Sequence, residues 1–168
     1  MRILYIGFDI EGVGGIATYS RHQVRALRQL GAKVFALSID KQDKFGERGL
    51  VDQRFGFGNR VNAVARALAV VATQRFDAVI VNHVYLAGLG LAARRLKGTP
   101  YAVNVYNIDI LCSLPRLREY AFAEADLVLA DCRYTIENMP RFHPRVPPVG
   151  LLYDPVDVSV FRPMPGAA

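Results

Sequence analysis

The chain has 168 residues, a length typical of one domain and short for a complete two-domain enzyme. Hydrophobic residues make up 52% of it and charged residues 21%, so it can bury enough apolar surface to fold, which excludes an intrinsically disordered chain. The longest uncharged apolar run, residues 84–93, is too short to span a membrane, and the acidic Asp9 and Glu11 argue against a signal peptide. Only two cysteines occur, which fits a reducing cytoplasm rather than a disulfide framework.

The net charge of +6 predicts an anionic partner, which could be a nucleic acid, an acidic membrane surface or a phosphorylated small molecule. The basic residues are scattered, and the densest cluster contains only Arg94, Arg95 and Lys97. A nucleic-acid-binding protein more often shows a basic stripe interleaved with aromatic residues, so we expect no nucleic-acid partner. The alternative to any anionic partner is an arginine-rich surface that only faces solvent.

The first forty residues contain the pattern of a β-α-β unit. The apolar run at residues 3–6 predicts a strand, and a turn-rich segment at 7–15 follows it. The next residues predict an amphipathic helix that ends near Gly31, and residues 33–39 predict a second buried strand. On the polar face of that helix lie Arg21, Arg25 and Arg28. These arginines either solvate the helix or rest on an anionic membrane surface, so a peripheral membrane contact is one expectation.

The same alternation of strands and helices continues to the end of the sequence. Helices are predicted at 59–75, 85–97, 116–124 and 133–139, and strands near 51–55 and at 77–82, 101–105, 127–130 and 149–152. In the helix at 59–75 the residues expected to face inward are Val61, Val64, Ala65, Leu68 and Val71. Strands that are apolar on both faces and alternate with helices predict an α/β fold with a doubly wound, mostly parallel, Rossmann-like sheet.

The C-terminal segment differs in composition from the rest. Six of the nine prolines fall in the last 25 residues, from Pro144 onward. Such a segment is typical of a linker that leaves a domain. We therefore expect one domain at residues 1–153 and an exit linker at 154–168, toward a C-terminal domain that is absent from this sequence.

A glycine-rich segment precedes the first predicted helix. Residues 12–17 match the pattern G-x-G-x-x-A of dinucleotide-binding folds, and Asp40 at the end of the second strand could bind a ribose. However, five residues separate the first strand from Gly12, whereas the glycines of a dinucleotide motif follow the strand directly. The helix start at Gly14 and Gly15 lacks a capping side chain, so its free amides predict a diphosphate site more than an NAD site. The alternative is a tight turn that binds nothing.

Polar residues also follow three of the predicted strands at their carboxyl ends, where open parallel sheets bind their ligands. A lone His at such a place is as often a hydrogen-bonded spacer as a functional group, so His83 alone decides little. Three clusters on one edge, however, predict a cleft. These polar residues, called the edge residues below, are Asp9, Glu11, His83, Tyr106, Asn107 and Asp109.

Several motifs are missing from the sequence. Neither the nucleophile motif G-x-S-x-G nor the phosphate-binding P-loop motif occurs, which disfavours an α/β-hydrolase and a P-loop enzyme. The three His and two Cys are dispersed, and Asp9-Ile10-Glu11, the nearest match to a metal-binding D-x-D motif, precedes the glycine turn rather than lying in it. We therefore expect no metal site.

Four segments of the sequence form an ordered set of motifs. The first is Gly14-Gly15 with the following helix and strand through Val34, and the second is residues 76–91, similar to PDVIHAH…AG with His83 on the second His. The third is residues 100–109 together with residues 125–130, of which the latter are similar to ADxVIAVS. The fourth is residues 153–163, similar to PNGVDxxxFxP. Together they resemble the N-terminal half of GT-B-fold glycosyltransferases, in particular the retaining family-four group. Their order and spacing extend over nearly the whole chain.

The resemblance implies a hexosyltransferase-type enzyme in which this domain binds the acceptor and a C-terminal domain holds the nucleotide sugar, so that the chain alone is inactive. It implies that Gly14 and Gly15 approach the donor diphosphate or the transferred sugar, without a metal or any cofactor besides that donor. We expect acceptor binding at the edge residues, with His83 and Asp109 as candidates for a catalytic role. The expected acceptor is a polysaccharide or a glycolipid, in the cytoplasm or at the inner face of a membrane.

The sequence departs from the family pattern at three places. Tyr106 stands where the family often has the His of His-Gly-x-Asp, Cys132 replaces the Ser of ADxVIAVS, and Asp154-Pro155 replaces the Asn-Gly of the exit signature. The change at Tyr106 predicts an unusual sugar or a subfamily without the usual catalytic role. Two alternatives remain: an NAD-linked oxidoreductase domain, and a non-catalytic module that binds a sugar or a nucleotide.

Overall fold

The computed structural model describes residues 1–40, 48–56, 60–156 and 158. In this part of the chain, seven strands form one parallel sheet in the order β3-β2-β1-β4-β5-β6-β7. The strands are β1 (Arg2–Phe8), β2 (Lys33–Asp40), β3 (Gln53–Gly56), β4 (Ala78–Val81), β5 (Tyr101–Val105), β6 (Leu127–Ala130) and β7 (Val149–Leu151). The predicted α/β fold with a doubly wound, Rossmann-like parallel sheet is therefore confirmed.

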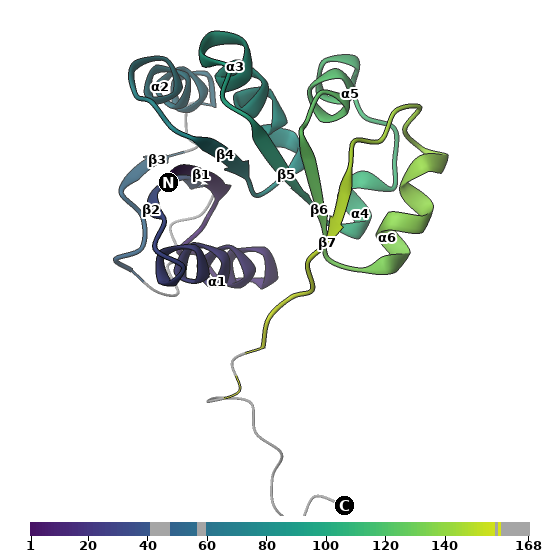
Figure 1. Cartoon of the computed structure of the whole chain (residues 1–168), viewed down its shortest axis with the longest axis horizontal. Helices are drawn as coiled ribbons and strands as arrows, with labels where there is room; N and C mark the ends of the chain where they lie inside the picture. Colours follow the sequence, from purple (N-terminus) through teal and green to yellow (C-terminus); the bar gives the residue numbers. More distant parts are fainter. Residues whose placement is uncertain (41–47, 57–59, 157, 159–168) are drawn as a thin grey trace, which may run out of the picture.

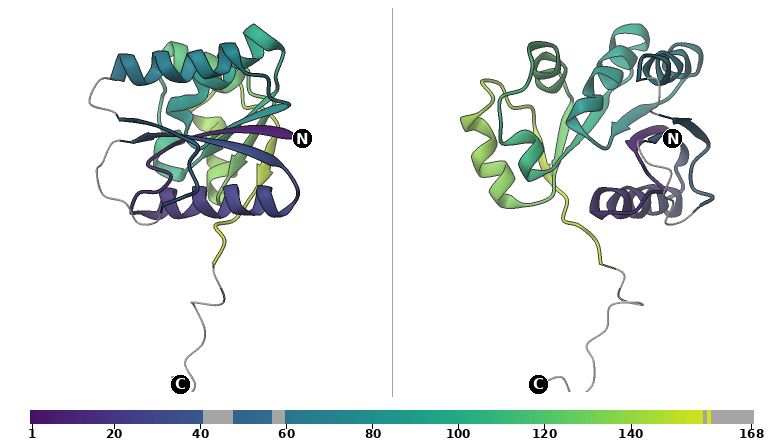
Figure 2. Two further views of the ribbon diagram at one scale, coloured as in Figure 1. Left: turned by 90° about the vertical axis from the view of Figure 1, so that its left-hand side faces the viewer. Right: turned by 180° about the vertical axis from the view of Figure 1, so that it is seen from behind.

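Helices lie on both faces of the sheet. The longer ones are α1 (Gly15–Gln29), α2 (Arg60–Thr73), α3 (Ala87–Lys97) and α5 (Arg116–Ala123), and the shorter ones are η1 (Val84–Leu86), α4 (Asn107–Ile110), α6 (Arg133–Asn138) and η2 (Met139–Arg141). Figures 1 and 2 show α2, α3 and α5 on one face and α1 on the opposite face. The larger apolar core lies beneath the three helices, and a smaller one with Tyr5, Val24 and Ala36 lies beneath α1.

The central strand β1 determines where a ligand can bind. It pairs with β2 on one side and with β4 on the other, so that Ile6 aligns with both Leu37 and Val81. After β1 the chain adds β2 and β3 on one side of it, and it then adds β4 to β7 on the other side. In open parallel sheets ligands usually bind at such a reversal, and here it lies at the carboxyl ends of β1 and β4.

The prediction for the inward face of α2 is wrong. Of the five residues expected there only Val71 is buried, whereas Val61 is 80% exposed and Val64 is 42% exposed. The side chains that pack inward are Ala63, Ala67, Val70 and Val71. α2 is apolar on most of its circumference, so its periodicity allows two faces. The alanines permit a closer approach of α2 to the sheet and to α3, and this closer packing decides the face.

The other predicted helices and strands agree with the observed ones to within a residue or two, except that the sequence pattern does not predict the single turn α4. Among the described residues, no helix combines the length and the hydropathy that a membrane crossing requires. The predicted exit linker is described at residues 154–156 and at 158. The rest of it, like the predicted capping residue Asn59, lies outside the described residues.

Candidate functional site

The three predicted clusters lie side by side at one edge of the sheet, because they follow the neighbouring parallel strands β1, β4 and β5. Asn82, at the end of β4, ties β1 and α1 to this edge. Its side chain accepts a hydrogen bond from Phe8 N at 3.1 Å and donates one to Ser20 Oγ at 2.9 Å. A Cβ at Gly7 would lie 2.7 Å from Asn82 Nδ2, which explains the glycine there. Because Asn82 is fully buried, these bonds fix β1 and the start of α1 against β4.

The loop between β1 and α1 is held by its own backbone and by Arg21. Asp9 adopts a φ of 43°, and its carbonyl accepts a hydrogen bond from Gly12 N at 2.7 Å. The Arg21 guanidinium donates to the Gly12 carbonyl, also at 2.7 Å. Gly14, the N-cap residue directly before α1, has a φ of 136°, which favours glycine, and it supplies no side-chain cap. The loop thus leaves the first amides of α1 at the surface, next to the exposed Gly15.

Glu11 holds this loop to the segment that leads into β3. It is 2% exposed, and its carboxylate accepts hydrogen bonds from Leu50 N at 2.6 Å and Val51 N at 3.0 Å and pairs with Arg54. Burial alone would raise the pKa of Glu11, but these hydrogen bonds and the Arg54 charge outweigh burial, and the pKa lies below its usual value. Protein donors therefore already bind the Glu11 carboxylate, and its contact with a sugar acceptor stays a prediction.

Asp40 belongs to the same group of charges. Its Oδ2 lies 3.1 Å from Arg54 Nη1, and its Oδ1 accepts a hydrogen bond from Ser38 Oγ. Burial is the largest influence on Asp40 and raises its pKa, although the bond from Ser38 and the Arg54 charge act in the opposite direction. A ribose hydroxyl at Asp40, as an NAD site would require, would compete with both of these partners.

His83 and Asp109 form a hydrogen-bonded pair between the end of β4 and α4. His83 Nε2 lies 3.1 Å from Asp109 Oδ2, and His83 Nδ1 accepts a hydrogen bond from Tyr85 N at 3.2 Å. Because Nδ1 accepts, the proton of a neutral imidazole lies on Nε2, which donates it to the carboxylate. The His83 side chain is 8% exposed and that of Asp109 is 23% exposed. Asp109, with the exposed Asn107 beside it in α4, is therefore the part that a ligand can reach.

Tyr106 lies between α1 and this pair. Its ring centre is 5.8 Å from that of Tyr19 in α1 and 6.4 Å from that of His83. Its hydroxyl is buried and, within the described chain, has no hydrogen-bond partner. Burial, together with the nearby Tyr5 and Tyr19, raises the pKa of Tyr106, so the side chain is a neutral phenol. Unlike the His that the family often has there, it cannot take up a proton near neutral pH.

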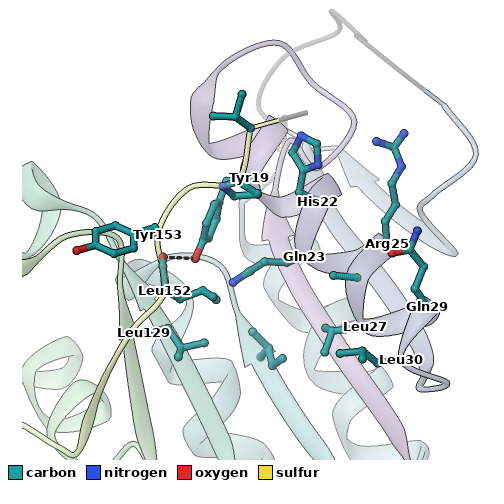
Figure 3. A pocket seen from close by; sticks show the side chains of 14 residues that line it. Tyr19, His22, Gln23, Arg25, Leu27, Gln29, Leu30, Leu129, Leu152 and Tyr153 are labelled. Atoms are coloured by element: carbon teal, nitrogen blue, oxygen red, sulfur yellow. Dashed lines mark hydrogen bonds between the residues drawn. The ribbon is translucent and has the colours of Figure 1, made fainter. Parts of the chain in front are cut away.

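A cavity of about 560 Å³ lies beside this edge, along α1 and the face of the sheet (Figure 3). Its walls include Leu27 of α1 and the strand residues Ile80 and Leu129. The Tyr19 hydroxyl donates to the Leu152 carbonyl at 3.1 Å, which ties the segment after β7 to α1. In the part of the chain that the structure describes, none of the edge residues lines this cavity.

Ser20 and Tyr19 also organise the edge, and the sequence pattern does not single them out as site residues. Ser20 offers one signal, because it is a polar residue on the otherwise apolar face of α1 and a buried hydroxyl requires a partner. Its Oγ donates to the Ile16 carbonyl at 2.8 Å and accepts from Asn82. The aromatic contact of Tyr19 with Tyr106 joins residues far apart in the sequence, and no local pattern predicts it.

Solved structures with the same fold are glycosyltransferases of the GT-B type. They include the lipopolysaccharide outer core galactosyltransferase WaaB (TM-score 0.63, 17% identity), the sucrose-phosphate synthase of Thermosynechococcus elongatus (0.75, 12%) and HepE of Anabaena in complex with UDP (0.67, 15%). The matches cover 94%, 98% and 98% of this chain and 47%, 50% and 47% of those chains. The chain therefore spans about half the length of these structures and has the fold of one of their two halves.

The sequence itself gives the family. The model of the glycosyl transferase 4-like domain matches residues 14–153, so the chain belongs to this family. No curated protein sequence gives a significant match. The resemblance to the N-terminal half of a GT-B glycosyltransferase is thus confirmed, whereas the roles assigned to single edge residues stay predictions.

Proposed function

We propose that this chain is the acceptor-binding domain of a glycosyltransferase that transfers a sugar from a nucleotide sugar to a polysaccharide or glycolipid acceptor. The observation that supports it best is one edge of the sheet that combines the reachable Asp109, oriented by the buried His83, with the uncapped start of α1. Such an edge can bind both a hydroxyl group and an anion. The similar structure of HepE contains UDP, which supports a nucleotide donor.

Each part of the edge has a role in this proposal. The backbone at Gly14 and Gly15, with the first amides of α1, approaches the donor diphosphate and stabilises the charge that develops on it. Asp109 and Asn107 form hydrogen bonds with acceptor hydroxyl groups, while His83 orients Asp109. Because Asp109 contacts the acceptor hydroxyl groups in this proposal, Asp109 and His83 are also the proposed candidates for a catalytic role. Further proposed contributors to acceptor binding are Asp9, Tyr106 and, mainly by holding the loop, Glu11.

The proposal places nucleotide binding in a second domain. The half-length match to the similar structures supports such a domain, and the chain alone then transfers no sugar. The proposal includes no metal and no cofactor other than the donor, because backbone amides would stabilise the leaving diphosphate. Measurable transfer from a nucleotide sugar by the 168-residue chain alone would contradict the two-domain arrangement.

The Gly15→Val substitution in the complete enzyme tests the diphosphate site. No atom lies within 4 Å of a Cβ placed at Gly15, so the variant should fold normally while the side chain occupies space that the phosphate needs. We expect kcat to fall about 30-fold, or about 2 kcal/mol. The matched control is Gly56→Val, another exposed glycine with open space, at the end of β3. An unchanged kcat would remove Gly15 from the active site, and micromolar NADH binding would favour the oxidoreductase alternative.

A peripheral contact with an anionic membrane at the cytoplasmic face is a further part of the proposal, supported by the net charge of +6. Arg21 and Arg28 in α1, however, donate hydrogen bonds to backbone carbonyls of their own domain. The contact should therefore be weak and sensitive to salt. Co-sedimentation with vesicles tests it, and equal binding to anionic and neutral vesicles at low salt would contradict it.

A further inference from the structure

His143 is buried between α5 and α4, in the segment that follows η2. Its side chain is 0% exposed, and its ring centre lies 5.0 Å from that of Phe122. Its Nδ1 lies 2.7 Å from Glu119 Oε2, and its Nε2 lies 2.6 Å from the carbonyl oxygen of Ile110. One imidazole therefore joins α5, through Glu119, to the last residue of α4.

The two partners determine where the protons of this imidazole lie. A carbonyl oxygen only accepts, so Nε2 carries a proton and donates it to Ile110. At Nδ1 one proton is shared with Glu119: either an imidazolium donates to the carboxylate, or a carboxyl group donates to the neutral ring. Both states keep the bond from Nε2 to Ile110. Glu119 therefore fixes the orientation of the ring, and His143 holds the carbonyl.

The bond to Ile110 matters because α4 is a single turn of four residues. A helix this short is not stable by itself, and its last carbonyl groups have no partner within the helix. His143 caps one of them. Asp109 directly precedes Ile110 in this turn, and its Oδ2 lies 3.1 Å from His83 Nε2. The cap on Ile110 thus also fixes the place of Asp109.

We propose that His143, oriented by Glu119, is a positioning residue of the acceptor site: it caps α4 through Ile110 and thereby holds Asp109 against His83. Its effect on sugar transfer rests on the proposed function, whereas its effect on the pair of Asp109 and His83 does not. Because His143 is fully buried, it has no contact with a substrate.

Two pairs of variants test this role. His143→Leu removes both hydrogen bonds, whereas His143→Gln keeps an amide that can donate to Ile110. Glu119→Leu leaves Nδ1 without its partner, whereas Glu119→Gln can donate from its amide to Nδ1 and keep the proton of Nε2 on Ile110. The Gln variants should therefore retain what the Leu variants lose. His22→Leu, at a half-buried histidine of α1, is the control.

The first measurement is the nitrogen NMR spectrum of the histidine side chains in the full chain, which reports the tautomer and protonation of His83. We expect the Leu variants at 143 and 119 to change the His83 signals, and the Gln variants and the control to leave them unchanged. The second measurement is the kinetics of the complete enzyme. There His143→Leu should raise the acceptor KM about tenfold and leave the donor KM unchanged.

The outcomes separate this proposal from the proposed function. If the Leu variants lower thermal stability but leave the His83 signals unchanged, the role of His143 is structural only and the proposal fails. It also fails if the Gln variants behave like the Leu variants. If the His83 signals respond as expected but the complete enzyme transfers no sugar, the proposed function fails and the positioning of Asp109 stands. If His143→Leu does not fold, the two Glu119 variants decide by the same criteria.

Discussion

The two acidic groups at the carboxyl edge of the sheet are built in different ways. Glu11 accepts hydrogen bonds from two backbone amides, pairs with an arginine and is 2% exposed. Asp109 pairs with His83, and its side chain is 23% exposed. In the sequence both are acids that follow a strand of a parallel sheet. The number of protein donors around each carboxylate distinguishes an acid that holds a loop from one that can bind a ligand.

The charges around the two groups differ as well. Glu11 and Asp40 share one guanidinium, that of Arg54, at the β2–β3 side of the edge. Hydrogen bonds overcome burial at Glu11 and lower its pKa, whereas burial dominates at Asp40 and raises its pKa. Asp109 instead faces a single imidazole. We infer that the first group keeps the loop in place and that the second holds a carboxylate that stays partly exposed.

The first prediction tests whether Glu11 holds the loop, which would be wrong if Glu11 can be removed without loss of stability. Glu11→Ala leaves two backbone amides without their buried acceptor and Arg54 with Asp40 alone, so we expect the free energy of unfolding to fall by about 3 kcal/mol. Urea denaturation measures this. The control is Glu137→Ala, at an exposed position of α6, which should change the free energy by no more than about 0.5 kcal/mol. A loss at Glu11 as small as in the control would mean that Arg21 and the backbone hold the loop alone.

The second prediction concerns Asp109. In Asp109→Asn the amide oxygen can still accept the hydrogen bond from His83 Nε2, so the geometry is kept and the charge is lost. We expect kcat/KM for the acceptor in the complete enzyme to fall about tenfold, or about 1.4 kcal/mol, with little change in stability. Steady-state kinetics and thermal unfolding measure the two effects. A loss of stability with unchanged kinetics would place Asp109 with Glu11, among the acids that hold the fold.

Most of the fold can be predicted from the sequence, because buried parallel strands and amphipathic helices leave strong local patterns. The run at Ile3 to Ile6 and the paired strand after Gly31 are examples, and both strands occur as expected. The pattern fails where it is ambiguous. In α2 the residues Val61 and Ala63 are both apolar, and only packing against α3 and the sheet decides which of them is buried.

The place of the site is also predictable, but its connections are not. Parallel strands bring their carboxyl ends to one edge, so the sequence alone places His83 and Asp109 near each other. It does not reveal that Leu50 and Val51 donate to Glu11, since residues that lie about forty positions away carry no local signal for this contact. His143 is a stronger example, because it directly precedes the proline-rich segment and its partners Glu119 and Ile110 are joined to it only by the tertiary fold.

The smallest effect expected concerns the pH dependence of the two carboxylates that share Arg54. The pKa of Glu11 is lowered on folding, so Glu11 contributes stability that is present above its unfolded pKa and is lost as the pH falls through its folded pKa. The pKa of Asp40 is raised, so the folded state binds the Asp40 proton more tightly, and stability is lost as the pH rises from the unfolded toward the folded pKa.

Substitution of each acid by its amide should therefore change stability in opposite directions with pH. Relative to the wild type, Glu11→Gln should be most destabilised near neutral pH and less so as the pH falls from the unfolded to the lowered folded pKa of Glu11, below which Glu11 is protonated in both states. For Asp40→Asn, the loss in free energy of unfolding relative to the wild type should be smallest near neutral pH. It should grow as the pH falls toward about 4, because only the wild type gains stability by binding the proton. Urea denaturation from neutral pH to below the folded pKa of Glu11 measures both differences. If the two variants show the same slope, Glu11 and Asp40 titrate as one group on Arg54, and the distinction drawn between them is wrong.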